Sequence, residues 1–268
     1  MASNKGESCS RERCFSALLK SLGNGLSQFQ SVSPPLKGQA IADFDHERFR
    51  SLMGRASSAL AQEANKMAIA FKSEPLPIPE ETRAMCAQVE QKTVLILSLY
   101  LSLPPGCGKH LLTTVGTMCS EAVAGLIELV KFLELKESVT ESDQEAMLLI
   151  VGSVWEKCDA IAKKLPSTNS ECCSDMIHAQ RALVGDATKE LEEALKLAID
   201  EEKIREETVA DDDEDSICPG ETWSQTERLL VPRGAGLLKT AAAILKKAAE
   251  AVREPSHANR ISRIEVNK

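Results

Sequence analysis

Apolar residues recur at intervals of three and four along most of this chain, which is the spacing of one face of an α-helix. The first clear stripe predicts a helix from about Asp43 to Phe71. Similar stripes predict four more helices, at about residues 80–102, 109–135, 142–165 and 170–199. Five long helices joined by short loops are typical of an antiparallel bundle, so we expect an all-α fold over residues 41–207. The second half of the 80–102 helix is apolar on nearly every side, which predicts that it is the most buried helix.

Alternating prolines separate the first two predicted helices. Neither a helix nor a central strand can pass through Pro75, Pro77 and Pro79. Pro79 suits the first turn of the second helix, and the acidic Glu80 and Glu81 that follow suit its positive end. We therefore expect a rigid joint at which the two helices fold back on one another.

The two ends of the chain differ from this helical body. Residues 1–40 are rich in serine and glycine, and Gly23 and Gly25 interrupt a short helical stretch near residues 11–22, so we expect a flexible N-terminal arm. Ten of the sixteen residues from Asp200 to Asp215 are acidic, which predicts a solvated, disordered stretch. We place the acidic linker at residues 208–228, and after it a C-terminal helix at 229–253 and a polar tail at 254–268.

Charge and cysteine content narrow the function classes. The net charge of −8 is carried by an acidic body, which argues against broad binding of a nucleic-acid backbone; residues 228–268 alone are clearly basic. The nine cysteines are scattered, odd in number and without a Cys-x-x-Cys pair, and no secretory signal precedes them. This pattern indicates free thiols in a reducing compartment. No apolar run approaches the roughly 18 residues needed to span a membrane.

One segment, Leu103–His110, looks like a phosphate-binding loop. It contains Pro-Pro-Gly-x-Gly-Lys after an apolar run, but Leu103 stands where the motif needs its first glycine. His110 stands where the motif needs the hydroxyl that binds magnesium. We therefore expect an ordinary turn between two helices, and keep a degenerate P-loop ATPase as a remote alternative.

Other candidate chemistry is equally weak, and we predict no catalytic, cofactor-binding or metal-binding residue. Cys172 and Cys173 lie near His178, but two residues five apart on one helix do not share a face well. Cys119 and Ser120 fall mid-helix, where we expect neither to face a substrate. We interpret the isolated histidines as ordinary polar or core residues and the paired glutamates as solvated surface residues. They are His46, His110, His178, His257, Glu80–Glu81, Glu192–Glu193 and Glu201–Glu202.

The predicted C-terminal helix is both basic and amphipathic. Its charged residues are Lys239, Lys246, Lys247 and Arg253, and its apolar residues are Leu237, Leu238, Ile244, Leu245 and Val252. Such a helix can bind a membrane surface, calmodulin or an acidic partner. Docking onto the acidic body or the acidic linker of the same chain is the simpler interpretation.

Several ordered blocks of residues resemble one family of interaction proteins. The first block runs from Phe44 and Phe49 through Glu63-Ala64, Phe71 and the proline joint to Cys86 and Gln88-Val89. Later blocks are Ser153-Val154-Trp155 with Cys158, Glu190 with Glu192 and Ala194, Trp223-Ser224 with Glu227 and Pro232, and Leu245-Lys246-Lys247. In order and spacing they resemble the GCIP family, the Grap2 and cyclin-D interacting proteins. The match fades near Arg253, which leaves a shortened or divergent C-terminus.

The resemblance implies an all-helical, non-enzymatic regulator that negatively regulates cell-cycle progression. It implies binding to a D-type cyclin, to a Grap2-type adaptor and to helix-loop-helix or Id proteins, with restraint of retinoblastoma-protein phosphorylation. It further implies a phosphoprotein with a role in transcription regulation, present in cytoplasm and nucleus. The family gives no catalytic residues, and the sequence does not assign the partner-binding face.

Two sequence patterns fit sites for acid-directed kinases, Ser142-x-x-Glu145 and Thr208-x-x-Asp211, although the first equally fits a helix-capping box.

A cytoskeletal or adhesion-type helical-bundle scaffold is the main alternative to the function that the family resemblance implies.

Overall fold

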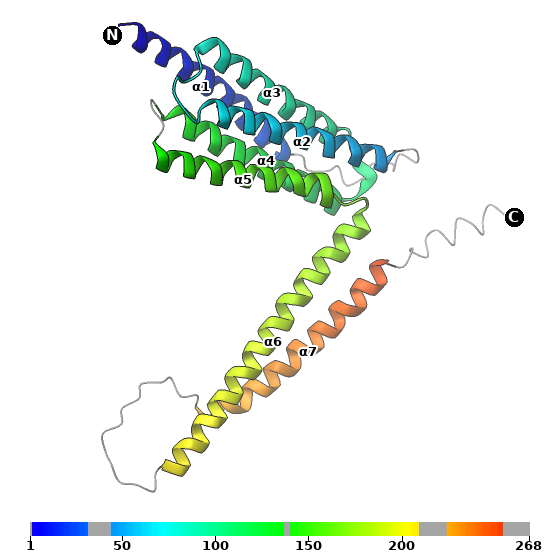
Figure 1. Cartoon of the computed structure of the whole chain (residues 1–268). Helices are drawn as coiled ribbons and strands as arrows, with labels where there is room; N and C mark the ends of the chain where they lie inside the picture. Colours follow the sequence, from blue (N-terminus) through cyan, green and yellow to red (C-terminus); the bar gives the residue numbers. More distant parts are fainter. Residues whose placement is uncertain (1, 32–43, 137–139, 209–223, 254–268) are drawn as a thin grey trace, which may run out of the picture. The chain divides into compact units, whose positions relative to one another are not determined.

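The structure is a computed structural model, and it describes residues 2–31, 44–136, 140–208 and 224–253 (Figure 1). These residues form seven α-helices and one short 3₁₀ turn, with no strand among them, which confirms the predicted all-α fold. The chain divides into two compact units, Met1–Asn169 and Ser170–Lys268.

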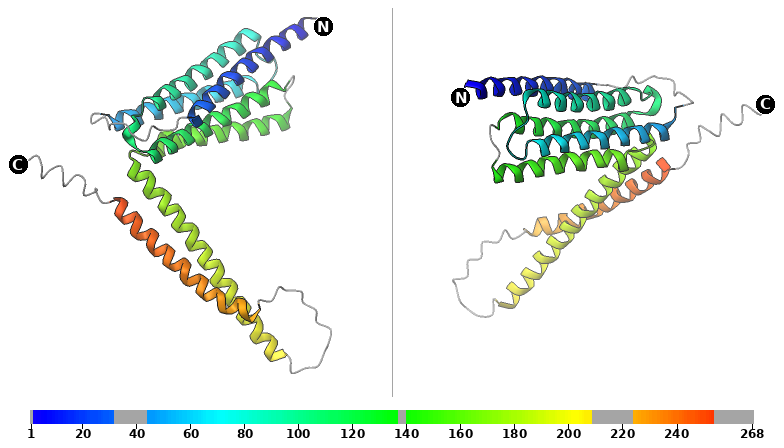
Figure 2. Two further views of the ribbon diagram at one scale, coloured as in Figure 1. Left: turned by 180° about the vertical axis from the view of Figure 1, so that it is seen from behind. Right: turned by 45° about the horizontal axis from the view of Figure 1, so that its top comes forward.

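The first unit is a bundle of five helices. In chain order they are α1 (Ala2–Ser31), α2 (His46–Ala70), α3 (Pro79–Leu101), α4 (Lys109–Glu134) and α5 (Glu141–Lys164). Helix α1 packs on α3 and α4, α2 packs on α3 and α5, and α4 packs on α5 (Figures 1 and 2). The contact between α3 and α4 is slight, because α1 lies between them.

Helix α1 corrects the prediction of a flexible arm over residues 1–40. Its buried residues follow intervals of three and four, as on one helical face: Phe15, Leu18, Leu22, Gly25 and Phe29. Gly23 and Gly25 do not break it. A Cβ at Gly25 would lie 3.8 Å from Thr93 Cγ2, so this glycine lies where α1 and α3 approach closely. An isolated glycine weakens a helix by only about 1 kcal/mol, less than the burial of one large apolar side chain contributes.

The direction of α1 follows from its contacts with α3 and with the end of α2. The Cys14 thiol lies 4.0 Å from the Pro79 carbonyl oxygen at the start of α3, and the Phe29 and Tyr100 rings lie 5.4 Å apart near its end. The two helices therefore run in the same direction. The Phe15 ring also lies 5.5 Å from that of Phe71, the residue that caps the C-terminus of α2.

The most buried helix is α4, and the prediction that α3 holds this place is wrong. Helix α4 has twelve buried residues against six in α3. Helix α4 packs against both α1 and α5, whereas the outer side of α3 exposes Val94, Leu95 and Leu101. An apolar sequence on every side of a helix therefore did not mean burial on every side.

The proline joint behaves as its sequence predicts. Helix α2 ends at Ala70, Pro77 is buried, and α3 begins at Pro79. The Glu81 carboxylate accepts a hydrogen bond from the Ile78 backbone N–H at 3.1 Å, which satisfies a donor at the helix start.

The turn between α4 and α5 is fixed by a capping box that begins two residues earlier than the sequence suggested. Thr140, not Ser142, is the N-cap, and the Asp143 carboxylate accepts a hydrogen bond from the Thr140 backbone N–H at 3.0 Å. The Asp143 carboxylate also pairs with Lys136, whose ammonium lies 5.0 Å from the centroid of the Phe132 ring. These contacts join the end of α4 to the start of α5.

The second unit is built from α6 (Asn169–Thr208) and α7 (Gln225–Arg253), which lie side by side and run in opposite directions (Figures 1 and 2). Helix α6 was predicted as the fifth helix of the bundle, but that place is taken by α1. Helix α6 also continues to Thr208, into the acidic stretch that was predicted to be disordered. The rest of the predicted linker, 209–223, and the tail, 254–268, lie outside the described residues.

Helix α7 begins earlier than the predicted 229–253 helix. It starts at Gln225 and runs through Pro232. Ser224 and Glu227 cap its start, since the Ser224 N–H donates to the Glu227 carboxylate at 2.7 Å. This hydrogen bond lowers the pKa of Glu227.

We expect Leu22→Ala to lower the free energy of unfolding of the first unit by about 2–5 kcal/mol, as for other fully buried leucines. The reason is that the Leu22 side chain is completely enclosed between α1 and its neighbours. Urea unfolding followed by circular dichroism measures the change. Ser16→Ala, at an exposed position of the same helix, is the matched control. A flexible arm would instead leave both variants as stable as the parent.

The Lys136–Asp143 contact predicts a pH-dependent stability. Hydrogen bonds from Lys136 and Thr140 lower the pKa of Asp143 below its unfolded value near 3.9. The stabilisation is therefore complete above about pH 4 and is lost as the pH falls towards the folded pKa. We expect Asp143→Asn to lower the melting temperature at pH 7 and to have a smaller effect at pH 3. An equal loss at both pH values would contradict this assignment.

Candidate interaction surface

The segment that resembles a phosphate-binding loop forms an ordinary interhelical turn. Pro105–Cys107 is a short 3₁₀ turn, Gly108 has a φ of 104°, and α4 begins at Lys109. The Asn169 side-chain oxygen accepts hydrogen bonds from the backbone N–H groups of His110 and Leu111 at 2.9 and 3.2 Å. These N–H groups at the N-terminus of α4 are the kind that hold phosphate in a true P-loop. A side chain of the protein therefore occupies the position at which this loop would bind an anion.

The conformation of Gly108 depends on the same contact. A positive φ of 104° disfavours any residue with a side chain, and a Cβ here would lie 2.4 Å from the Asn169 side chain. The glycine is thus explained by close packing against Asn169.

Three cysteine thiols are buried in the bundle and chemically quiet. Burial raises the pKa of Cys86, Cys119 and Cys158 to about 12 in each case. Because the thiolate is the reactive form, these groups are poor nucleophiles at neutral pH. Their burial makes these three cysteines ordinary core residues.

No group of three or more His, Cys, Asp or Glu side chains within the described ranges is arranged to hold a metal ion. His257 of the predicted set lies outside those ranges. The glutamate pairs serve structural contacts where they are described: Glu81 caps α3, and Glu192 forms an ion pair with Lys239.

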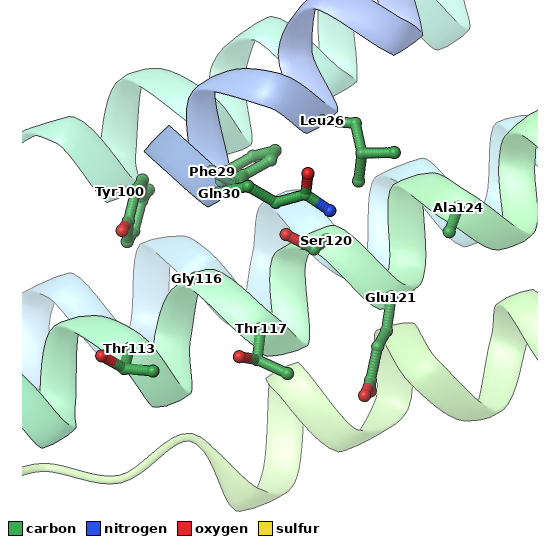
Figure 3. A pocket seen from close by; sticks show the side chains of 10 residues that line it. All are labelled: Leu26, Phe29, Gln30, Tyr100, Thr113, Gly116, Thr117, Ser120, Glu121 and Ala124. Carbon is green, nitrogen blue, oxygen red and sulfur yellow. The ribbon is translucent and has the colours of Figure 1, made fainter. Parts of the chain in front are cut away.

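The first unit has a shallow hollow of about 460 Å³ between α1, α3 and α4 (Figure 3). Its upper wall is formed by Leu26, Phe29 and Gln30 of α1 and by Tyr100 of α3. Its floor is the exposed face of α4, formed by Thr113, Gly116, Thr117, Ser120, Glu121 and Ala124. Gly116 permits this approach, because a Cβ there would lie 2.9 Å from the Tyr100 hydroxyl oxygen.

The residues that line this hollow are suited to contact with a partner molecule. Ser120 does line it, contrary to the expectation that this serine faces no substrate. Glu121 is the one charged residue of the lining. Burial raises the pKa of the Tyr100 phenol, so this group stays protonated at neutral pH. The hollow therefore offers hydroxyl groups, one carboxylate and two aromatic rings to a partner.

The outer side of α5 presents an apolar face. Leu148, Leu149 and Trp155 are exposed there, the tryptophan by 40% of its surface. Gly152 lies between them on the same side, and a Cβ at this position would meet no atom within 4 Å. Leu148, Gly152 and Trp155 are spaced by four and three residues, as the anchor positions of a helix-binding surface are. The sequence block around Trp155 supported the family resemblance, but its periodicity did not show which residues face outward.

The basic C-terminal helix docks within the second unit. Lys239 of α7 pairs with Glu192 of α6 at 2.6 Å, and Ala235 and Ala249 are buried. The helix thus docks onto its own chain, which was the simpler interpretation of its basic, amphipathic sequence. No helix in the described part of the chain has the length and hydropathy that a membrane-spanning segment needs.

Comparison with known proteins gives the family. A family model described as "Grap2 and cyclin-D-interacting, N-terminal" matches residues 52–197, more than half of the chain. The chain belongs to this family. The matched residues include all of α3, α4 and α5, and with them the exposed face that carries Trp155.

Curated relatives of this chain come from several vertebrates. The chain is 31% identical over 220 residues to the Cyclin-D1-binding protein 1 homolog of Xenopus laevis, covering 82% of this chain and 64% of the relative. It is 30% identical over 217 residues to the homolog of Danio rerio, with 78% and 60% covered. It is 25% identical over 237 residues to Cyclin-D1-binding protein 1 of Homo sapiens, with 85% and 65% covered. The chain thus spans somewhat under two thirds of the length of these relatives.

The family and these relatives are named after binding partners, and no reaction appears in their names. This agrees with the interpretation of the chain as an interaction protein. The two kinase patterns stay predictions: Ser142 lies in the first turn of α5, and Asp211 lies outside the described residues.

We expect Asn169→Ala to lower the free energy of unfolding by about 1 kcal/mol, the usual loss for a side chain that caps a helix start. Thermal unfolding measures this change. Lys109→Ala is the matched control, since the Lys109 ammonium group takes no part in the hydrogen bonds that hold this turn, whereas a P-loop would depend on it. Isothermal calorimetry with Mg-ATP should detect no heat for the parent chain. Binding of Mg-ATP that Lys109→Ala abolishes would contradict the structural role of this turn.

Proposed function

We propose that this chain is a non-enzymatic helical interaction protein that binds a D-type cyclin and restrains cell-cycle progression. The observation that carries the proposal is the family match over residues 52–197, which is the main part of the helical bundle. Binding of the cyclin would limit phosphorylation of the retinoblastoma protein by the cyclin-dependent kinase. The chain then acts by occupying a surface of its partner, which needs no catalytic group.

The α5 face is the contact that we place at the centre of this interaction. Trp155 and the two leucines beside it are exposed on a helix that the bundle holds rigidly through Val151, Val154 and Cys158. Tryptophan is enriched among the residues that dominate binding energy, and a rigid helix loses little conformational freedom when it binds. The opening at Gly152 leaves room for a side chain of the partner between Leu148 and Trp155.

The proposal includes further partners and locations that follow from the resemblance to the family. They are a Grap2-type adaptor, which the family's name supports, and helix-loop-helix or Id proteins. Through the latter the chain would take part in transcription regulation. The resemblance further supports a presence in cytoplasm and nucleus and regulation by phosphorylation, which we include in the proposal.

We expect the full chain to bind a purified D-type cyclin, and Trp155→Ala to weaken this binding by about 2 kcal/mol, or roughly thirtyfold in Kd. Biolayer interferometry with the immobilised cyclin gives both values. Circular dichroism confirms that the variant keeps its helices, as expected for an exposed residue.

Leu95→Ala on the outer side of α3 is the matched control, since Leu95 is exposed to a similar extent. It should bind as the parent does. Absence of binding by the parent chain would overturn the proposed function. Normal binding by Trp155→Ala together with loss in Leu95→Ala would move the contact from α5 to α3.

A further inference from the structure

Helix α7 carries a row of large apolar side chains that its neighbour α6 does not cover. Leu230, Leu237 and Ile244 are exposed by 54%, 74% and 62%. They are spaced exactly seven residues apart, close to two helical turns, so they lie along one side of the helix. This is the spacing of a helix–helix contact row.

Helix α6 carries a second row with the same spacing. Met176, Leu183 and Leu197 are exposed, and Glu190 occupies the position of the series that lacks an apolar residue. The two rows together thus expose six large apolar side chains.

Both rows lie on the same face of the hairpin. On α6, Leu183 precedes the buried Thr188 by five residues; on α7, Leu230 precedes the buried Ala235, and Ile244 the buried Ala249, by the same interval. Each row is therefore rotated by the same angle from the side on which the two helices pack. Because α6 and α7 run in opposite directions (Figures 1 and 2), equal rotation brings both rows to one face.

Contacts between the helices set the level of each row along the hairpin. Lys239 pairs with Glu192 at 2.6 Å, and a Cβ on Gly234 would lie 3.9 Å from Leu191 Cδ2. This register places Leu183 near the level of Ile244 and Leu197 near the level of Leu230. Between the middle parts of the rows the residues are small: Ala187, Ala194, Ala241 and Ala248. The face is therefore a mainly apolar strip, with large apolar side chains along both sides and Glu190 as the one charged residue in the rows.

Charge differs between the two outer edges of this face. The residues three positions beyond the α6 row are acidic, at Asp186, Glu193 and Asp200. The equivalent positions beyond the α7 row include Arg233 and Lys247, with no acidic residue among them. One edge is thus negative and the other positive, and both flank the same apolar strip.

We propose that this face binds a second copy of the chain, so that two α6–α7 hairpins form an antiparallel four-helix bundle. A two-fold axis parallel to the helices places α6 of each copy over α7 of the other. Each acidic edge then meets a basic edge, and Glu193 of one copy lies near the level of Arg233 of the other. A two-fold axis across the helices would instead bring like charges together.

The charge pattern is the argument for a second copy as the occupant. A face with one acidic and one basic edge is complementary to itself after a two-fold rotation, whereas an unrelated helix has no reason to match both edges. Pairing of apolar rows in this way also gives each helix two antiparallel neighbours, as in other four-helix bundles. The dimer goes beyond the proposed binding of a D-type cyclin and does not depend on it.

Sedimentation equilibrium of the full chain over a micromolar concentration series tests the dimer. We expect a mass twice the 29.1 kDa of one chain at the upper concentrations. Leu237→Glu should raise the dimer Kd at least about tenfold, because it buries a charge in the apolar strip. Leu149→Glu, at an equally exposed leucine of α5, is the matched control and should leave the dimer intact.

Charge exchange tests the orientation of the two copies. Glu193→Arg and Arg233→Glu should each weaken the dimer, and the double variant should restore it, since opposite charges then meet again. A chain that stays monomeric throughout the series would overturn the proposal, as would a dimer that Leu237→Glu does not weaken. A dimer that the double variant fails to restore would overturn the proposed axis. Cyclin binding is measured separately, with monomeric Leu237→Glu, so failure of either proposal is distinguishable from failure of the other.

Discussion

The bundle depends on the insertion of α1 between α3 and α4. Helices α3 and α4 hardly touch each other. The apolar side chains of α4 on the side towards α3 are therefore covered by α1. Phe15, Leu22 and Phe29 supply this cover along the whole length of the contact, and the rings of Phe71 and Tyr100 meet it at its two ends. With α1 in place, α4 packs against α1 on one side and α5 on the other, and it is the most buried helix of the unit.

This arrangement decides which surfaces remain for partners. Helix α3 packs on α1 and α2 and turns an apolar side outward, and α5 presents Trp155 on its own outer side. The hollow of Figure 3 has the same origin, since it lies where α1 covers α4 incompletely. The surfaces available for interaction are thus the outer sides of helices whose inner sides build the core.

The sequence predicted local structure better than the pairing of helices. Proline chemistry placed the joint between α2 and α3 correctly, and the periodicity of α4 gave its bounds almost to the residue. Periodicity shows that a face is apolar but not what covers it, which is why α3 seemed more buried than α4 and α6 seemed part of the bundle. Helix α1 was missed because two glycines concealed a regular apolar pattern. The Asn169 cap was beyond prediction, since it joins positions almost sixty residues apart. Family blocks in the sequence, by contrast, gave the relationship that the comparisons confirm.

The buried thiols of the bundle have one more consequence. Cys86, Cys119 and Cys158 lie on three different helices and cannot react with an alkylating reagent while the core is closed. Their modification therefore requires that part of the bundle open, and its rate reports how often this happens. Each helix thus contains its own chemical reporter of local opening, which allows the motions of α3, α4 and α5 to be followed separately in the unlabelled protein.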